Sequence, residues 1–199
     1  MTASSLSCIL LAAGRSSRMN QNKALLRWQG LSLIAYQVKT IQHAGIKDVV
    51  AVLGFGAAEI SRELNGSSVK IVKNNDYSSG KCSSIRIGWH GMDKNSTGVL
   101  IAAVDQPLLS EVLCQMDKLH KSDPESIIIP VHNGKRGHPT LLPSLLYSEL
   151  LLITEETEGL RSIIKKHHKR VKLLKTVDPR ILLNLNTPDD YEAAYREDL

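Results

Sequence analysis

Short runs rich in valine, isoleucine and leucine recur along this chain and alternate with segments of helical periodicity. The runs lie at residues 7–13, 48–53, 69–72, 98–104 and 126–131. Apolar runs without polar alternation are typical of strands buried on both faces, as in a parallel sheet covered by helices. The alternation therefore predicts a three-layer α/β/α architecture with a mostly parallel sheet.

Helices are expected between and after these runs. Their predicted ranges are 31–45, 83–92, 107–120, 143–153, 158–167 and 188–198. Gly45 is expected to end the first helix and Pro188 to open the last one. Because no repeat, linker or low-complexity segment divides the chain, we expect residues 1–199 to form a single domain.

Composition excludes several classes of protein. The three cysteines have neither disulfide-framework nor zinc-site spacing, so a reducing cytoplasm is the expected setting. The apolar run near the N-terminus is too short for a membrane span, and no membrane partner is expected. The net charge of +5 favours anionic partners. The basic run at 165–175 contains no Phe, Tyr or Trp for base stacking, so nucleic acid is not an expected partner.

The loop after the first apolar run has the composition of a phosphate site. Small residues at Ala12, Ala13 and Gly14 let backbone N–H groups approach an anion closely. Three cations follow and can surround its oxygens: Arg15, Arg18 and Lys23. The loop is not a P-loop, because Ala24 stands where that motif needs Ser or Thr. A triphosphate fits this description.

Asp105 follows the apolar run at 98–104, so its carboxylate should project at the carboxyl edge of the sheet. Two interpretations remain open at this point. It can cap the helix expected from Pro107, or it can bind Mg²⁺, which prefers one or two carboxylates together with phosphate oxygens and water.

Five motifs occur in an order that covers nearly the whole chain. They are LAAGRSSRM with KALLRW (11–28), NNDYSSGKCSSI (74–85), VLIAAVDQPLL (99–109), PVHNGKRGHPTLL (130–142) and LNLNTPDDY (183–191). The set resembles the MobA-like nucleotidyltransferases, and most closely their molybdenum cofactor cytidylyltransferase branch. The resemblance implies a Rossmann-like nucleotidyltransferase domain.

The resemblance also implies residue roles. The backbone of Ala12, Ala13 and Gly14 would carry the nucleotide, and Arg15, Arg18 and Lys23 would bind its β- and γ-phosphates. The further nucleotide-binding residues would be Asn74, Gly80, Ser83 and Ser84. The pterin-binding residues would be Lys135, Arg136, Gly137 and His138. Asp105 and Asn186 would bind Mg²⁺, although Asn184 and Asn186 stand where this branch usually carries aspartates. Ala13 favours CTP over GTP.

The expected reaction is transfer of CMP from CTP to the phosphate of molybdenum-bound molybdopterin, which yields molybdopterin cytosine dinucleotide and pyrophosphate. Three alternatives stay open. One is a guanylyltransferase or another nucleotidyltransferase of the same fold. Another is a non-catalytic molybdenum cofactor chaperone that serves a xanthine-dehydrogenase-type client. The third, a nucleic-acid-binding domain, is suggested by charge alone.

Overall fold

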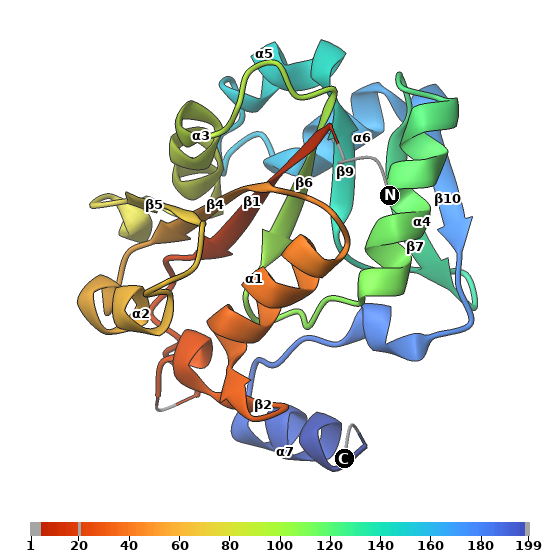
Figure 1. Ribbon diagram of the computed structural model, residues 1–199. Helices are drawn as coiled ribbons and strands as arrows, with labels where there is room; N and C mark the ends of the chain where they lie inside the picture. The colour runs from red at the N-terminus through yellow and green to blue at the C-terminus, as the bar shows by residue number, and fades with distance from the viewer. Residues whose placement is uncertain (1–4, 20, 198–199) are drawn as a thin grey trace.

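A central sheet of eight strands organises the computed structural model, which describes residues 5–19 and 21–197 (Figure 1). Seven strands run in the order β10-β7-β9-β6-β1-β4-β5, and β8 pairs with β7. Their bounds are β1 Leu6–Ala12, β4 Asp48–Leu53, β5 Lys70–Lys73, β6 Gly98–Ala103, β7 Ile127–His132, β8 Lys135–Arg136, β9 Thr140–Pro143 and β10 Val171–Lys175. The five predicted strands are confirmed, with small shifts at their ends.

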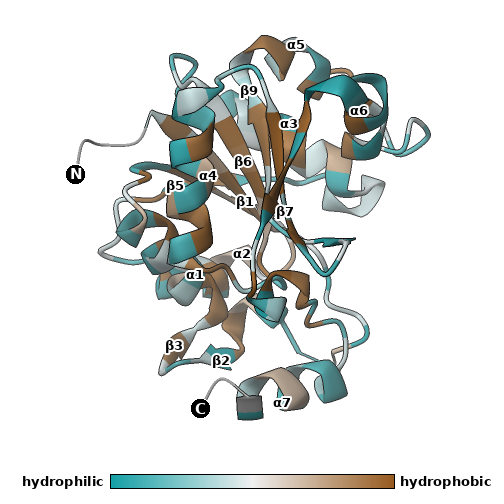
Figure 2. Cartoon of the chain, turned by 90° about the vertical axis from the view of Figure 1, so that its right-hand side faces the viewer, coloured by the Kyte–Doolittle hydropathy of each residue, from teal (hydrophilic) through white to brown (hydrophobic). Residues whose placement is uncertain are grey.

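Helices cover both faces of this sheet, as predicted (Figures 1 and 2). Their bounds are α1 Leu33–His43, α2 Ala57–Glu63, α3 Lys81–Gly91, α4 Ser110–Ser122, α5 Tyr147–Leu150, α6 Leu160–Lys166 and α7 Pro188–Glu197. Alternate residues of β1 divide between two buried clusters: Cys8 and Leu10 pack with α1, α2 and α4, whereas Ile9 and Leu11 pack with α3, α5 and α6. Burial of β1 from both sides explains its unbroken apolar sequence.

The sheet is mostly parallel, but β9 runs antiparallel to both β6 and β7. The predicted helix at 143–153 is therefore wrong at its start. Pro143 belongs to β9, a 3-10 turn (η3, Ser144–Leu146) follows, and α5 occupies only Tyr147–Leu150. The period of the leucines in this segment does not distinguish a strand that turns into a short helix from one long helix.

Three other helices begin later than predicted, and one of them, α6, begins at Leu160 rather than at residue 158. Leu31 and Ser32 form β3, which pairs with Arg27–Trp28 (β2) in a hairpin, so α1 begins only at Leu33. Gly45 follows α1 with φ of +87°, which confirms it as the stop. Helix α4 begins at Ser110, so Asp105 lies too far upstream to cap it, and that interpretation is excluded. The predicted last residue of α7, 198, lies outside the described residues.

The basic run at 165–175 contains a strand that the sequence did not predict. Residues Val171–Lys175 form β10, which pairs in parallel with β7 at the edge of the sheet. Its lysines made the segment look like a solvated surface, but charged side chains are common on exposed edge strands, where they oppose pairing with other chains. Lys172 also forms an ion pair with Asp123.

Two close approaches hold the site-bearing segments against the sheet. A Cβ atom at Gly88 of α3 would lie 2.4 Å from Cγ2 of Ile9, so α3 packs directly onto β1. The backbone N–H of Val104 donates to the carbonyl of Leu11 at 2.9 Å, which joins the ends of β1 and β6. No helix in the described part of the chain is both long and apolar enough to cross a membrane.

Candidate active site

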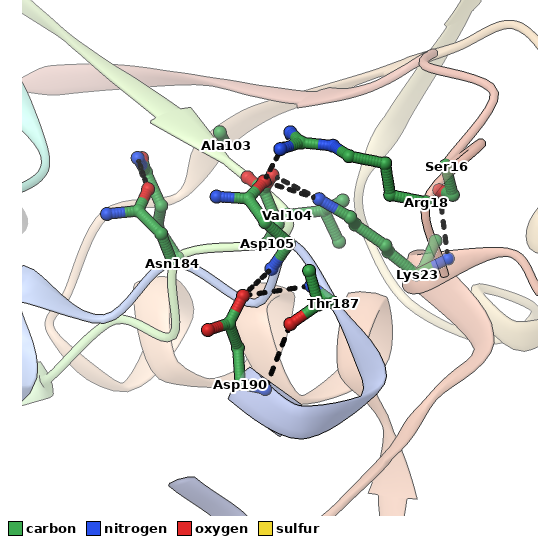
Figure 3. Close-up of polar contacts among 12 residues, drawn as sticks. Ser16, Arg18, Lys23, Ala103, Val104, Asp105, Asn184, Thr187 and Asp190 are labelled. Atoms are coloured by element: carbon green, nitrogen blue, oxygen red, sulfur yellow. Dashed lines mark hydrogen bonds and ion pairs between the residues drawn. The ribbon is translucent and has the colours of Figure 1, made fainter. Parts of the chain in front are cut away.

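Three segments that are distant in sequence meet where β1 and β6 end (Figure 3). The ammonium of Lys23, in the 3-10 turn η1 (Lys23–Leu25), donates to Asp105 Oδ2 and to Asn186 Oδ1, each at 2.9 Å. Arg18 also donates to Asn186 Oδ1, at 3.4 Å. Lys23 is only 9% exposed, so its charge depends on these two oxygen partners. The structure thus brings together four of the predicted site residues.

Short-range hydrogen bonds fix Lys23 in this position. Its backbone N–H donates to Ser16 Oγ at 3.1 Å, and Asn22 caps the turn by accepting from the N–H of Ala24 at 3.0 Å. Ser16 itself has a positive φ of 54°, an uncommon conformation for a residue with a side chain. The first loop is therefore folded around the lysine rather than simply exposed.

The segment before α7 positions Asn186. The N–H of Leu185 donates to the Asp105 carbonyl at 2.8 Å, which joins this segment to the end of β6. Asp190 Oδ2 accepts from the N–H groups of Thr187 at 2.9 Å and Asn186 at 3.2 Å. The hydrogen bonds from Thr187 and Asn186 hold the pKa of Asp190 below its usual value. Asp190 is a supporting residue that the sequence interpretation missed, although an acid in the first turn of a helix is its usual signal.

A cavity of about 300 Å³, here called the first-loop cavity, lies beside this cluster. Its wall includes Ala12, Ala13, Gly14, Ser16, Lys23, Gly80, Lys81, Ser84 and Asp105. The N–H of Phe55 donates to the Ala13 carbonyl at 3.0 Å, and a Cβ atom at Gly54 would lie 2.6 Å from that oxygen. Gly54 opens the segment GFG (54–56), whose sequence fits no dinucleotide-binding motif. Because Gly54 has no side chain, the loop after β4 can pack closely against the loop after β1 and support it.

The remaining residues predicted to bind the nucleotide fall into two groups. Gly80 and Ser84 line the first-loop cavity, whereas Asn74 and Ser83 are buried and are not among its lining residues. The Asn74 amide donates to the hydroxyls of Ser83 at 2.8 Å and Ser84 at 2.9 Å. Helix α3 begins at Lys81 with Gly80 as its cap, so Ser83 lies inside the helix and is not its N-cap. Arg15 is exposed, with its guanidinium carbon 5.7 Å from the centre of the Tyr77 ring.

A second, larger cavity of about 840 Å³, the hairpin cavity, adjoins the first and shares Leu11, Lys81 and Ala103 with it. Its charged and polar wall residues include Lys81, Gln106, Arg136, His138, Glu155, Glu158, Arg161 and Lys165. Arg136 comes from the β7–β8 hairpin, whose turn residues Asn133 and Gly134 both have positive φ. Lys135 is exposed on the same hairpin and does not line the cavity.

Gly137 and His138 connect this hairpin to the segment before Asn186. The N–H of His138 donates to the Ile181 carbonyl at 3.0 Å, and a Cβ atom at Gly137 would lie 2.5 Å from that same oxygen. Burial lowers the pKa of His138, and the charge of Lys81 lowers it further, while Asp105 acts in the opposite direction. The imidazole is therefore neutral at pH 7 and lies within electrostatic reach of the Lys23 cluster.

The oxygens of Asp105 and Asn186 are the kind that Mg²⁺ prefers, and both already face one positive charge, the Lys23 ammonium. Within residues 5–19 and 21–197, no group of three or more acidic, histidine or cysteine side chains forms a metal cage. A pair of oxygen ligands fits an ion that also takes phosphate oxygens and water. Asn184 faces elsewhere, since its Oδ1 accepts from Gln106 Nε2 at 2.6 Å.

Comparison with known proteins places the chain in a family. Residues 8–171 match the MobA-like NTP transferase domain. The chain is 26% identical over 192 residues to a molybdenum cofactor cytidylyltransferase of Escherichia coli K12, which covers 96% of both chains. It is 30% identical over 178 residues to a nicotine blue oxidoreductase of Paenarthrobacter nicotinovorans, covering 85% of this chain and 86% of that protein.

Solved structures show the same fold. Rv0371c from Mycobacterium tuberculosis superimposes with a TM-score of 0.84 at 21% identity, over 98% of this chain and 100% of that one. A nucleotidyl transferase from Methanothermobacter also gives a TM-score of 0.84, at 23% identity over 97% of both chains. The first loop, the ends of β1 and β6 and most of the hairpin cavity lie within the matched domain. The chain belongs to the MobA-like NTP transferase family.

Proposed function

We propose that this protein is a cytoplasmic molybdenum cofactor cytidylyltransferase, which transfers CMP from CTP to the phosphate of molybdenum-bound molybdopterin. The observation that carries the proposal is the Lys23–Asp105–Asn186 cluster, which lies at the carboxyl edge of the sheet beside two adjoining cavities. The first-loop cavity would take the nucleotide and the hairpin cavity would take the pterin. Ligands of open α/β sheets bind at this edge.

In the proposed reaction a phosphate oxygen of the acceptor forms a bond to the α-phosphorus of CTP. The bond from that phosphorus to the oxygen bridging to the β-phosphate breaks, and pyrophosphate leaves with the electron pair. The acceptor phosphate is already ionised at neutral pH, so no general base is needed. Rate enhancement would come from positioning and from neutralising charge on the phosphates.

The chain's own residues supply that charge. Lys23, Arg18 and Arg15 would bind the β- and γ-phosphates, and the backbone of Ala12, Ala13 and Gly14 would hold the nucleotide against the end of β1. Asn74 would act from behind by fixing the hydroxyl of Ser84, which lines the cavity, and Ser83 would hold the preceding turn by donating to the carbonyl of Gly80. Asp105 and Asn186 would hold Mg²⁺, which when bound neutralises phosphate oxygens.

Two features support CTP as the nucleotide and a pterin as the acceptor. Ala13 is the residue that the cytidylyltransferase branch carries, and the cytidylyltransferase relative matches along 96% of this chain. By contrast, a guanylyltransferase of Xanthomonas euvesicatoria matches over 112 residues, at 31% identity and 53% of this chain. Arg136, Gly137 and His138, which line the hairpin cavity, and Lys135 beside them would contact the pterin and its phosphate.

A cofactor chaperone is the second candidate, favoured by one observation. Asn184 and Asn186 offer amides where the cytidylyltransferase branch carries aspartates, which removes negative charge from the proposed metal site. A chaperone would bind molybdopterin and deliver it to a molybdoenzyme client without cleaving a nucleotide.

One assay separates these candidates. The protein is incubated with Mg²⁺, molybdenum-loaded molybdopterin and each ribonucleoside triphosphate in turn, and pyrophosphate is measured. The proposal expects release with CTP and little with GTP, ATP or UTP. Release with GTP alone would assign the guanylyl reaction instead, and pterin binding without pyrophosphate from any nucleotide would support the chaperone.

A further inference from the structure

Lys81 stands at the junction of the two cavities. It is the first residue of α3, it is exposed, and it lines both the first-loop cavity and the hairpin cavity. Within the part of the chain that the structure describes, no hydrogen bond or ion pair joins its ammonium to a carboxylate. It lies in the segment NNDYSSGKCSSI (74–85), directly after Gly80.

Most other charges on the hairpin cavity already have partners. Glu158 forms an ion pair with Lys165, and the charge of Arg161 also acts on Glu158. Glu155 Oε1 accepts from the N–H of Cys82 at 2.7 Å. That bond occupies an amide at the start of α3, so the positive charge offered here comes from the Lys81 side chain rather than from the helix end. Among the described wall residues, Lys81, Arg136 and Arg161 are the cations that form no ion pair with a carboxylate, and of these three only Lys81 also lines the first-loop cavity.

The rest of the cavity suits a flat ring. Leu11, Ile85, Ile101, Ile129 and Ile164 contribute an apolar surface to the same cavity that Lys81 borders. A ring system bearing a phosphate would place the ring on this surface and its charge beside a cation, because burying the phosphate without one is unfavourable. The lysine then lies between the ring and the nucleotide.

Lys81 also lies on the side of the cavity that faces the Lys23 cluster. His138 and Lys81 both line the hairpin cavity. Asp105 and Lys81 also line the same first-loop cavity. The acceptor phosphate must come to this junction, because it has to meet the α-phosphate there.

We propose that Lys81 binds the phosphate of the acceptor at the junction of the two cavities and makes the protein select phosphorylated over unphosphorylated acceptors. The inference rests on the proposed function and extends it with a specificity residue. The bond is a charge-assisted contact to a phosphomonoester, in which a lysine acts as a point charge. It involves no covalent step.

The test measures binding and turnover separately. Affinities of wild-type protein, Lys81→Met and Lys81→Arg are measured by fluorescence for molybdopterin and for the same pterin without its phosphate. Lys39→Met, a surface lysine on α1 away from both cavities, is the control. CTP affinity in the presence of Mg²⁺ is measured in parallel, and steady-state turnover gives kcat and KM for the acceptor.

Wild-type protein should bind the phosphorylated pterin at least about tenfold more tightly, which corresponds to about 1.4 kcal/mol. In Lys81→Met this preference should fall to about twofold or less, with a rise in acceptor KM that exceeds any change in CTP affinity. Lys81→Arg should recover part of the preference. Lys39→Met should behave as wild type.

Each possible negative result would contradict a different part of the proposal. If Lys81→Met keeps the full preference, or if wild-type protein binds both pterins equally, the role of Lys81 is wrong even where turnover with CTP is normal. If no nucleotide yields pyrophosphate but the preference exists and depends on Lys81, the transferase proposal fails and the phosphate contact stands. A protein that binds neither pterin contradicts both.

Discussion

The first-loop cavity is walled by segments that leave the middle of the sheet, whereas the hairpin cavity is walled largely by segments from its β7–β10 side. In the wall of the first-loop cavity, called the first wall below, Lys23 is buried and bonded to two oxygens. Its own turn is held by Ser16 and Asn22. In the wall of the hairpin cavity, called the second wall below, Arg136 is exposed on a two-residue strand. Under the proposed function, the contacts for a triphosphate would thus be held firmly and the contacts for the acceptor would be looser.

This difference has a physical origin. Parallel strands buried on both faces fix the direction of every residue that follows them, so the loops after β1 and β6 converge in a narrow region. The β7–β8 hairpin is fixed by its turn, by its pairing and by the contact of Gly137 and His138 with Ile181, and its Arg136 side chain stays exposed. We expect substitutions on the first wall to act on the reaction itself, and substitutions on the second to act mainly on acceptor binding.

The largest effect is expected for Asp105→Asn. The change keeps the shape of the side chain but removes the carboxylate that faces Lys23 and would hold Mg²⁺, so turnover should fall by about 10³-fold or more. Asp189→Asn, in the exposed first turn of α7, should leave turnover near wild type. Circular dichroism checks that the fold is kept. An Asp105→Asn variant with near-normal turnover would remove this residue from the metal site.

The second prediction compares a cation from each wall. Lys23→Met should lower kcat/KM for CTP about 10²-fold, because a buried charge aimed at the phosphates is lost. Arg136→Met should raise the acceptor KM about tenfold and leave CTP affinity unchanged. Steady-state kinetics with each substrate varied in turn measures both effects. If Arg136→Met weakened CTP as much as Lys23→Met, the division between the walls would be wrong.

Gly54→Ala tests how firmly the first wall is built. Its Cβ would lie 2.6 Å from the Ala13 carbonyl oxygen, so the loop after β1 has to move. We expect a loss of about 1–3 kcal/mol in the free energy of unfolding, together with weaker CTP binding. For stability alone, Gly14→Ala is the matched comparison, since its Cβ would meet no atom within 4 Å. Equal thermal unfolding of the two variants would contradict the supporting role of Gly54.

Asn186→Asp should strengthen Mg²⁺ binding at the proposed metal site. A second carboxylate beside Asp105 restores the charge that the cytidylyltransferase branch carries, so the Mg²⁺ concentration for half-maximal turnover should fall several-fold. A magnesium titration of initial rates measures this. An unchanged requirement would show that the Asn186 oxygen does not bind the ion.

The smallest effect concerns pH. Burial and the nearby charge of Lys81 lower the pKa of His138 below 6.5, so the unfolded chain binds a proton at this residue more readily than the folded protein does. The free energy of unfolding should therefore decrease as the pH falls below about 6.5. In His138→Gln this decrease should be smaller. Urea unfolding at about pH 7.5 and about pH 5.5 checks it, and equal decreases in the two proteins would contradict the buried position of His138.

The sequence predicted much of the first wall and less of the second. Apolar runs revealed β1, β4, β5, β6 and β7 and placed the first loop and Asp105 at the carboxyl edge of the sheet, but the pairing of β1 with β6 that brings them together was not predicted. The hairpin cavity depends on elements without such a signal. The leucines in and after β9 have a spacing that also fits a helix, and the lysines of β10 are typical of a solvated surface segment. The position of Lys81 between the two cavities has no local sequence pattern, and the first-turn position of Asp190 does not reveal that it accepts from the N–H of Asn186.

Cleavage of labelled CTP would test the central claim most directly. The protein is supplied with Mg²⁺, molybdenum-loaded molybdopterin and CTP labelled either at the α-phosphorus or at the γ-phosphorus. The account predicts that the α-label enters the pterin product and the γ-label leaves as pyrophosphate, in equal amounts. A γ-label on the pterin, or an α-label that never reaches it, would contradict nucleotidyl transfer at the Lys23–Asp105–Asn186 cluster.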